Sequence, residues 1–337
     1  MAAYAKENLR EDFDGGRLIA ENFVYNGLVG GSYLPGKQFD ITQPQVEQQG
    51  QFVVKYFEVN VTLSKEDIQV TNKGPNAMFR LIDSRMETAY MTLGAHLAIS
   101  LYLNGQGNYT AVPNGLAEAL NDGSTASWDN ATYTSYGTLT RGGQIGQAYN
   151  SPPTNLAGGT IEYNTLEEVY GDATFGAGEF EPNIGITTVK GYSYMKEKFQ
   201  TQQRFNDTQD PKIGFNGLKF NNSVIMKSRY APGSYLTGPS GAGTNDPIAV
   251  TYLTQSTNGA VTAYPVGNLT NTGESLFFLN ARKPFMNFYM TNDEEYGMGF
   301  TGFKPSAGNT LISGQVLLAC NVTWSPRYHR QIYGFTG

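Results

Sequence analysis

One segment limits the possible folds of this chain more than any other: an uninterrupted apolar periodicity over residues 77–103. Pro75-Asn76 precedes it as a helix start, and Asn104-Gly105 follows it as a stop. The pattern predicts an amphipathic helix about 40 Å long, more than twice the length of the mean globular helix. Its apolar positions recur at steps of three and four: Met78, Ile82, Met86, Ala89, Leu93, Leu97 and Leu101. Its other face carries Arg80, Ser84 and Glu87.

A strand-like alternation precedes the helix. Apolar and polar residues alternate with a period of two on both sides of a Gln-rich tract at 42–51. We interpret residues 32–64 as a long two-stranded hairpin with a polar tip. An isolated hairpin is barely stable in water, so we expect it to lie on a neighbouring subunit. Its apolar side chains are Phe39, Ile41, Phe57, Val59, Val61 and Leu63.

The segments around these two elements follow a simple order. Residues 1–27 mix charged and apolar positions and are expected to form an arm that packs on another body. Residues 105–160 are rich in Gly, Asn, Ser and Thr, with Trp128 as an anchor, and 232–273 is expected to be a surface insertion. The last residues are read as a basic tail containing Arg327, His329 and Arg330. Helices are predicted at 164–170 and 189–205, and strands at 183–188, 218–226, 276–280, 285–289 and 311–324.

Composition favours an assembled protein. Only 15% of the residues are charged while 13% are aromatic, which implies apolar surface that other copies would cover. The net charge of −6 does not attract nucleic acid to the chain as a whole. Cys320 is the only cysteine, so a reducing compartment is expected. The N-terminus has no signal-peptide pattern, and no apolar stretch reaches the ~20 residues of a membrane span.

Candidate enzymatic motifs are weak. Residues 31–37 match G-x-x-x-x-G-K, but Gln38 stands where a phosphate loop needs Ser or Thr, so a Gly/Pro turn is favoured. His96 lies inside the predicted helix, and Cys320 lies in a predicted strand among apolar residues, as a buried thiol would. Two histidines and one cysteine, widely separated, do not make a typical zinc site. We therefore expect no catalytic residue, no metal and no cofactor.

Carboxylates and lysines offer three further candidates. The acidic runs are Asp293-Glu294-Glu295 and the pair Glu179 and Glu181, and solvated loops are favoured for both. Paired carboxylates alone leave glycosidase chemistry open, because their separation in space is not visible in the sequence. Lys37 and Lys55 lie in the predicted hairpin, where a crosslink to another subunit is conceivable but not favoured.

The order of arm, hairpin, long helix, mixed α/β region and C-terminal strands resembles the coat-protein fold of tailed double-stranded DNA bacteriophages, named for phage Hong Kong 97. Four stretches carry the resemblance to one branch of major capsid proteins in particular. They are NIGITTVKGYSYMKEKFQTQQRF (183–205), GFNGLKFNNSVIMKSRY (214–230), LFFLNARKPFMNFYM (276–290) and LISGQVLLACNVTWSPRYHRQIYG (311–334).

The resemblance implies an α+β fold with named parts. These are an N-arm (1–27), an E-loop hairpin (28–70), a peripheral (P) domain (71–112) with a spine helix at 77–103, an axial (A) domain (mainly 113–310, with the insertion at about 232–273), and C-terminal strands (311–337) that return to the core.

The resemblance also implies a function. The chain would be a structural protein that self-assembles into pentamers and hexamers of an icosahedral head around double-stranded DNA, which it contacts non-specifically. Its partners would be other copies, a separate scaffolding protein, a portal and possibly a decoration protein, with no membrane. It would be assembled in the host bacterial cytoplasm and located in the virion. The expected contacts between subunits are Phe39, Ile41, Phe57, Val59, Val61, Arg80 and Glu87.

Two alternatives stay open. A β-rich carbohydrate-binding or adhesin module, with Tyr and Trp stacking on sugars, would explain the composition but not the long helix. A hydrolase using paired carboxylates would have a deep acidic cleft in a monomer. Oligomeric state separates the coat protein from both.

Overall fold

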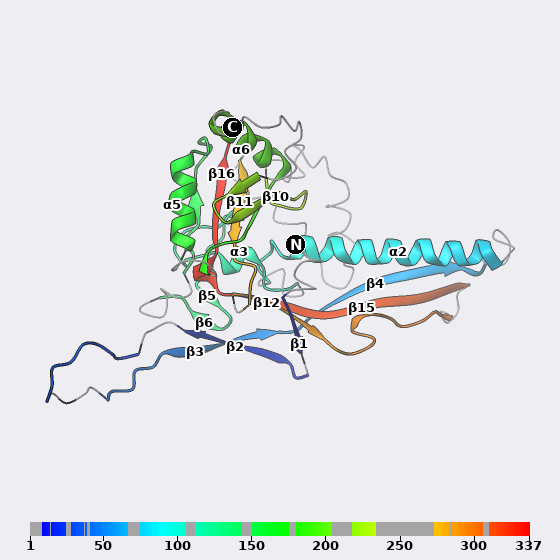
Figure 1. Cartoon of the computed structure of the whole chain (residues 1–337). Helices are drawn as coiled ribbons and strands as arrows, with labels where there is room; N and C mark the ends of the chain where they lie inside the picture. The colour runs from blue at the N-terminus through cyan, green and yellow to red at the C-terminus, as the bar shows by residue number, and fades with distance from the viewer. Residues whose placement is uncertain are drawn as a thin grey trace.

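The computed structural model describes residues 9–13, 15–24, 28–36, 38, 41–66, 75–105, 112–142, 150–174, 180–203, 218–233, 273–283, 285–305 and 310–337. An elongated part contains the long helix α2 and the strands β4 and β15, and a compact part sits beside one end of that helix (Figure 1). A two-stranded ribbon, β2–β3, leads away from both.

The predicted long helix is present as α2 (Pro75–Ser100), 26 residues or about 39 Å. Ala89, Leu93 and Leu97 are buried, as the apolar periodicity requires. The predicted last three residues leave the helix in a turn, in which Tyr102 N bonds to Ile99 O and Leu103 N to Ser100 O. The helix packs along β4.

A six-stranded sheet is organised around one long strand, β15 (Leu311–Trp324), whose bounds coincide with the predicted strand. Along one edge β4 (Lys55–Ser64) pairs with residues 311–320. Along the other edge three strands follow one another, and a short N-terminal strand adds in parallel to the first of them. These four strands are β12 (Met286–Thr291), β13 (Gly297–Phe300), β14 (Lys304–Pro305) and β1 (Arg10–Phe13).

A second sheet forms the centre of the compact part, in the order β7-β16-β11-β8-β10-β9. Along β11, Leu276 and Phe278 pack with the cluster that includes α5 and α6, while Phe277 and Leu279 pack with the main core. The whole strand is buried because both faces are covered. The bounds are β7 (Thr154–Asn155), β8 (Ile184–Thr187), β9 (Leu218–Phe220), β10 (Ser223–Lys227), β11 (Glu274–Leu279), β16 (Arg330–Phe335), α5 (Tyr163–Ala173) and α6 (Val189–Gln203).

The stretch 112–142 is mostly irregular, as its Gly- and Asn-rich composition predicts, and it packs on the core through Trp128, which is 2% exposed. Its short elements are α3 (Leu116–Ala119), β5 (Ser135–Tyr136) and β6 (Leu139–Thr140).

Two sequence predictions near the C-terminal sheet are wrong. The predicted strand 218–226 is the tight hairpin β9–β10, which turns at Asn221 and Asn222. The expected basic tail is an interior strand: after the 3-10 turn Pro326–Tyr328, Arg330 begins β16, which is buried throughout. The side-chain amide of its buried Gln331 is anchored to the core, where Nε2 donates to Leu120 O at 2.9 Å and to Ser127 Oγ at 2.7 Å. The predicted insertion 232–273 lies almost entirely outside the described residues.

The predicted pairing within the hairpin 32–64 is also wrong. The described partner of β4 is β15, whereas Ile41 lies outside any strand. The Gln-rich tract is not a tip: its second half belongs to β3 (Glu47–Val53), which pairs with β2 (Leu18–Val24) from the predicted arm. Local alternation correctly identified β4 as a strand but carried no information on which distant strand would pair with it.

Candidate functional site

The ribbon carries a group of apolar side chains that the chain itself leaves uncovered. Ile41 is 88% exposed and Leu28 is 79% exposed, in the extended stretches that continue from the ends of β2 and β3. Several exposed large apolar side chains along one projecting segment are typical of a surface that another molecule covers. The other members are Val24, Val29, Tyr33 and Leu34. We call these six residues the apolar tip.

The root of the ribbon, in contrast, packs tightly on the body. Phe23 and Phe52 form an aromatic cluster with Tyr136, with ring centroids 5.1 to 6.4 Å apart. Gly137, with φ of +55°, lets the ring of Phe52 approach, because an added Cβ would lie 2.5 Å from it. The backbone N–H of Gln51 donates to Gly137 O at 2.8 Å.

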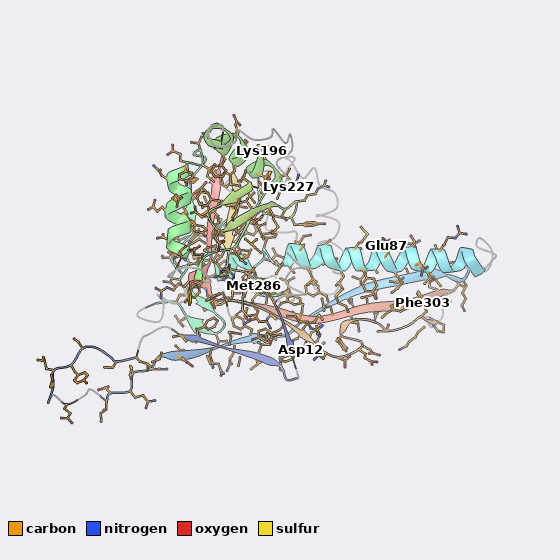
Figure 2. All side chains as sticks on the ribbon, in the orientation of Figure 1. Asp12, Glu87, Lys196, Lys227, Met286 and Phe303 are labelled. Carbon is orange, nitrogen blue, oxygen red and sulfur yellow. The ribbon has the colours of Figure 1, made fainter. Side chains whose placement is uncertain are left out.

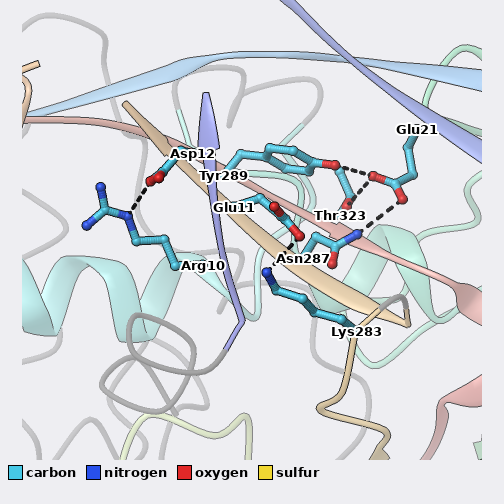
Figure 3. A network of polar contacts seen from close by, with 8 residues as sticks. All are labelled: Arg10, Glu11, Asp12, Glu21, Lys283, Asn287, Tyr289 and Thr323. Carbon is cyan, nitrogen blue, oxygen red and sulfur yellow. Dashed lines mark hydrogen bonds and ion pairs between the residues drawn. The ribbon is translucent and has the colours of Figure 1, made fainter. Parts of the chain in front are cut away.

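A carboxylate adds a polar contact to this root (Figure 3). Glu21, in the middle of β2, accepts hydrogen bonds from Tyr289 Oη at 2.6 Å, from Asn287 Nδ2 at 3.1 Å and from Thr323 Oγ1 at 3.3 Å. The donors belong to β12 and β15, so the Glu21 side chain joins the ribbon to the sheet that is organised around β15. Burial, and then the hydrogen bond to Glu21, raises the pKa of Tyr289, which keeps its hydroxyl a donor. We call Glu21 with these three donors the root clamp.

The predicted contact residues of the hairpin separate into two groups. Ile41 belongs to the apolar tip, and Phe39 lies outside the described residues. Val61 is only 4% exposed, and Phe57 and Val59 are half-buried against the same core. These three side chains therefore pack mainly within their own chain, where they contribute to the core beneath α2.

Arg80 and Glu87, the two predicted contact residues on the helix, are both exposed. Figure 2 shows Glu87 on the side of α2 away from β4 and β15, about halfway along the helix. The outer face of the first half of α2 therefore presents polar and charged side chains to solvent.

Sequence reasoning missed most of the apolar tip and all of the root clamp, although both left signals. Leu28, Val29, Tyr33 and Leu34 sit among Gly and Pro without helix or strand periodicity, so they could not belong to an amphipathic element. Glu21 shares the inward face of β2 with Ile19 and Phe23 by the period of two, which marks it as a carboxylate that needs donors.

His329 is buried and structural. Its Nδ1 accepts from the backbone N–H of Asn280 at 3.0 Å, and its Nε2 lies 3.0 Å from Phe285 O, to which it donates in this tautomer. Burial lowers the pKa of His329 to about 4, so the ring is neutral and both nitrogens are used. His96, half-buried in α2, also has a lowered pKa because of burial.

The remaining enzymatic candidates match their structural interpretations where they are described. Cys320 is buried, which raises the pKa of its thiol. Asp293-Glu294-Glu295 forms an exposed loop between β12 and β13. The described part of the G-x-x-x-x-G-K match, residues 31–36, is an exposed turn region, while Lys37 and Glu179 lie outside the described residues. Within the described ranges, no cluster of His, Cys, Asp and Glu has the geometry of a metal site.

An open groove of about 220 Å³ lies between α5 and α6 and is lined by both apolar and charged side chains, among them Tyr163, Phe199 and Lys198. Among the described helices, none has the length and apolar character to cross a bilayer.

The sequence matches no family model and no curated protein, whereas the three-dimensional structure has extensive similarity to solved structures. The capsid of cyanophage A-1(L) superposes with a TM-score of 0.60 at 11% identity, covering 100% of this chain and 92% of that chain. The capsid of a native GTA particle gives 0.58 at 7% identity, with 100% and 91% coverage.

A cellular protein has the same architecture. The SrpI encapsulin of Synechococcus elongatus gives a TM-score of 0.57 at 10% identity, covering 98% of this chain and 86% of that chain. Similarity over nearly the whole length of both chains confirms the Hong Kong 97-type fold that the order of elements led us to expect.

Proposed function

We propose that this chain is a coat subunit that self-assembles into pentamers and hexamers of a closed icosahedral shell around double-stranded DNA, as the major capsid protein of a tailed bacteriophage. It acts as a structural protein, not as an enzyme. Two observations support the proposal: the fold is that of two capsid chains and an encapsulin, and the ribbon projects an uncovered apolar tip.

The apolar tip is the observation that carries the proposal. The segment that carries its side chains extends away from the body of the chain (Figure 1), and these side chains are exposed. The root of the ribbon, in contrast, is packed and hydrogen-bonded. A monomer would gain nothing from holding Ile41 and Leu28 in water. A neighbouring copy that covers them gains about 25 cal/mol for each Å² of apolar surface buried.

Each part of the chain receives a role in this proposal. The pairing of β2 with β3 supports moving the E-loop from 28–70 to 18–53, and the N-arm then reduces to the residues before β2. The spine helix and C-terminal strands form the rigid plate of the P-domain, and the second sheet with α5 and α6 forms the A-domain. Arg80 and Glu87 face a neighbouring copy along the outer side of α2.

The remaining partners follow from the same proposal. The coat is built in the host bacterial cytoplasm with a separate scaffolding protein and a portal, and ends in the virion, where a decoration protein could bind its outer surface. Many overlapping contacts, each weak, make the closed shell stable because they form together. Contacts with the packaged DNA are non-specific.

The first test is the oligomeric state. Size-exclusion chromatography with light scattering, followed by electron microscopy of the largest fraction, should give closed particles or rings of five and six copies. The assay is run with the purified chain and, separately, with a scaffolding partner. A strict monomer in both would reject the coat function and favour the carbohydrate-binding alternative.

The role of the apolar tip is tested in the same assay with Ile41→Asp. The substitution places a charge on a side chain that is 88% exposed, so the free subunit should unfold at the same denaturant concentration while shell yield falls steeply. Gln45→Asp is the matched control, since it adds the same charge at an exposed position of the same segment. Equal yields for both variants would remove the apolar tip from the interface.

The enclosed molecule is tested on particles from the natural source of the chain. Double-stranded DNA that resists nuclease until the shell is opened supports the phage-head assignment. Intact particles without such DNA would support a shell with a different content and leave the assembly function in place.

A further inference from the structure

The root clamp has a consequence for how the ribbon is used. We infer that Glu21 is a positioning residue. Its carboxylate holds the ribbon root to the sheet around β15 and so fixes the direction in which the apolar tip is presented to a second copy. This inference rests on the proposed coat function for its purpose, but its structural part can be tested without assembly.

The donors around the Glu21 carboxylate all come from one face of the sheet that contains β12 and β15. Tyr289 and Asn287 are two residues apart on β12, and Thr323 stands opposite Asn287 on β15, so all three point from one face of the sheet toward β2. Both carboxylate oxygens are used, Oε1 by Asn287 and Oε2 by the two hydroxyl groups (Figure 3). Hydrogen bonds to an ionised acceptor are about twice as strong as neutral ones.

The other strand of the ribbon, β3, is attached to the body through its backbone. Ala20 and Gln51 stand opposite each other in the ribbon, and the N–H of Gln51 points away from β2 to Gly137 O in the turn between β5 and β6. The body therefore holds both strands of the ribbon: β2 by the clamp, and β3 by this hydrogen bond and by Asn321 Nδ2, which donates to Val53 O at 2.8 Å. The aromatic cluster of Phe23, Phe52 and Tyr136 adds an apolar contact. Attachments on both strands fix an orientation, whereas one attachment would leave a pivot.

Two carboxylates near the clamp, those of Glu11 and Glu21, have different kinds of partner. Glu11 is close enough to contribute to the raised pKa of Tyr289, and its own carboxylate pairs with Lys283 Nζ at 2.7 Å. The negative charge of Glu11 is thus matched by a lysine on the same edge, while that of Glu21 is matched only by hydrogen-bond donors among the described contacts. Removing Glu21 takes away the carboxylate that accepts from all three donors, and the amide and the two hydroxyl groups must then find other acceptors.

A fixed direction matters for assembly because ordering an arm costs entropy. A ribbon already held at the right angle does not lose that freedom when it meets a neighbour, so less of the contact energy is spent on ordering. A loose ribbon with the same apolar tip would bind more weakly, although no contact residue had changed.

The test is amide hydrogen exchange at Gln51, since the bond that protects this amide exists only while the root lies on the body. In Glu21→Ala we expect exchange at Gln51 to rise by about tenfold to a hundredfold, the range for losing hydrogen bonds to a charged group. Exchange at Phe277, in the middle of the buried strand β11, should stay unchanged and shows that the fold as a whole is intact.

Two further variants make the test specific. In Glu21→Gln the amide can still accept from Tyr289, and its N–H can donate to Asn287 after that side chain rotates, so we expect partial rescue. Glu47→Ala removes an exposed carboxylate from the same ribbon and should leave Gln51 protected. If amide exchange at Gln51 is unchanged in Glu21→Ala, or if exchange at Phe277 rises equally, the positioning role is overturned.

Assembly is then measured on the same proteins. The concentration needed for shells should rise by about tenfold or more in Glu21→Ala and recover in part in Glu21→Gln. If amide exchange at Gln51 rises as expected but neither the wild type nor any variant forms shells, the clamp stands and the coat function fails. If Gln51 responds and Glu21→Ala assembles like wild type, the direction of the ribbon does not matter and the inference is overturned.

Discussion

Val59 lies directly opposite Val316 in the antiparallel pairing of β4 with β15. Val316 is fully buried, and Val59 is half-buried against the same core. The alternation that made Val59 a candidate for contact between subunits therefore serves the packing of this chain beneath its own long helix.

Val59→Asp should destabilise the free subunit instead of blocking assembly alone. A carboxylate on this half-buried apolar face loses hydration without gaining a donor, and we expect the free energy of unfolding to fall by about 2–4 kcal/mol. Asn60→Asp, on the exposed face of the same strand, should change it by less than about 0.5 kcal/mol. Urea unfolding under non-assembling conditions measures both. A stable Val59→Asp subunit that fails to assemble would restore the interface role.

Gly137→Ala should loosen the ribbon root. The position has a positive φ and its Cβ would collide with the buried ring of Phe52, so we expect a loss of about 2–5 kcal/mol from backbone strain and overpacking together. Gly158→Ala is the matched control: its φ is +87° but open space surrounds the added methyl group, so only the backbone cost of about 1–2 kcal/mol remains. Thermal unfolding of the two variants separates the terms, and equal losses would argue against the contact with Phe52.

His329 should make stability depend on pH below neutrality. Its folded pKa is about 4 against about 6.5 in the unfolded chain, so between these values the unfolded state binds more protons. The contribution of His329 is then fully present above pH 6.5, declines as the pH falls, and is lost below pH 4, a difference of about 3 kcal/mol. His329→Asn keeps an acceptor and a donor but does not titrate, so unfolding curves of both proteins from pH 7 to 4 isolate the effect. Parallel curves would contradict it.

Cys320 should be unreactive in the folded chain. Its thiol is buried in β15, and burial disfavours the thiolate that attacks a thiol reagent. We expect a disulfide reagent to react with it only as fast as the protein unfolds, and at once in denaturant. Thr62→Cys, on the exposed face of β4, provides a thiol that should react immediately in the folded state. Rapid reaction of the unmodified chain would show that β15 opens locally.

The elements that depend on neighbours along the chain could be predicted from the amino-acid pattern. The three- and four-residue periodicity of 77–103 predicts a long helix with one buried face, which the structure has as α2, and the apolar run of 311–324 predicts the long strand β15. The order of the predicted elements, together with four stretches that resemble major capsid proteins, led to the expectation of the Hong Kong 97-type fold. Burial of Cys320 followed from its apolar neighbours in the strand.

The pairing of strands and the exposure of surfaces, in contrast, depend on contacts between distant parts of the folded chain. A period of two shows that β4 has an apolar face, but the partner of that strand, β15, lies some 250 residues away and no local signal specifies it. Whether His329 is a solvated tail residue or a buried one depends on the place of β16 between β7 and β11. The apolar tip became visible only when the exposure of its side chains was known. The root clamp became visible only with its long-range hydrogen bonds, because it joins residues more than 260 positions apart.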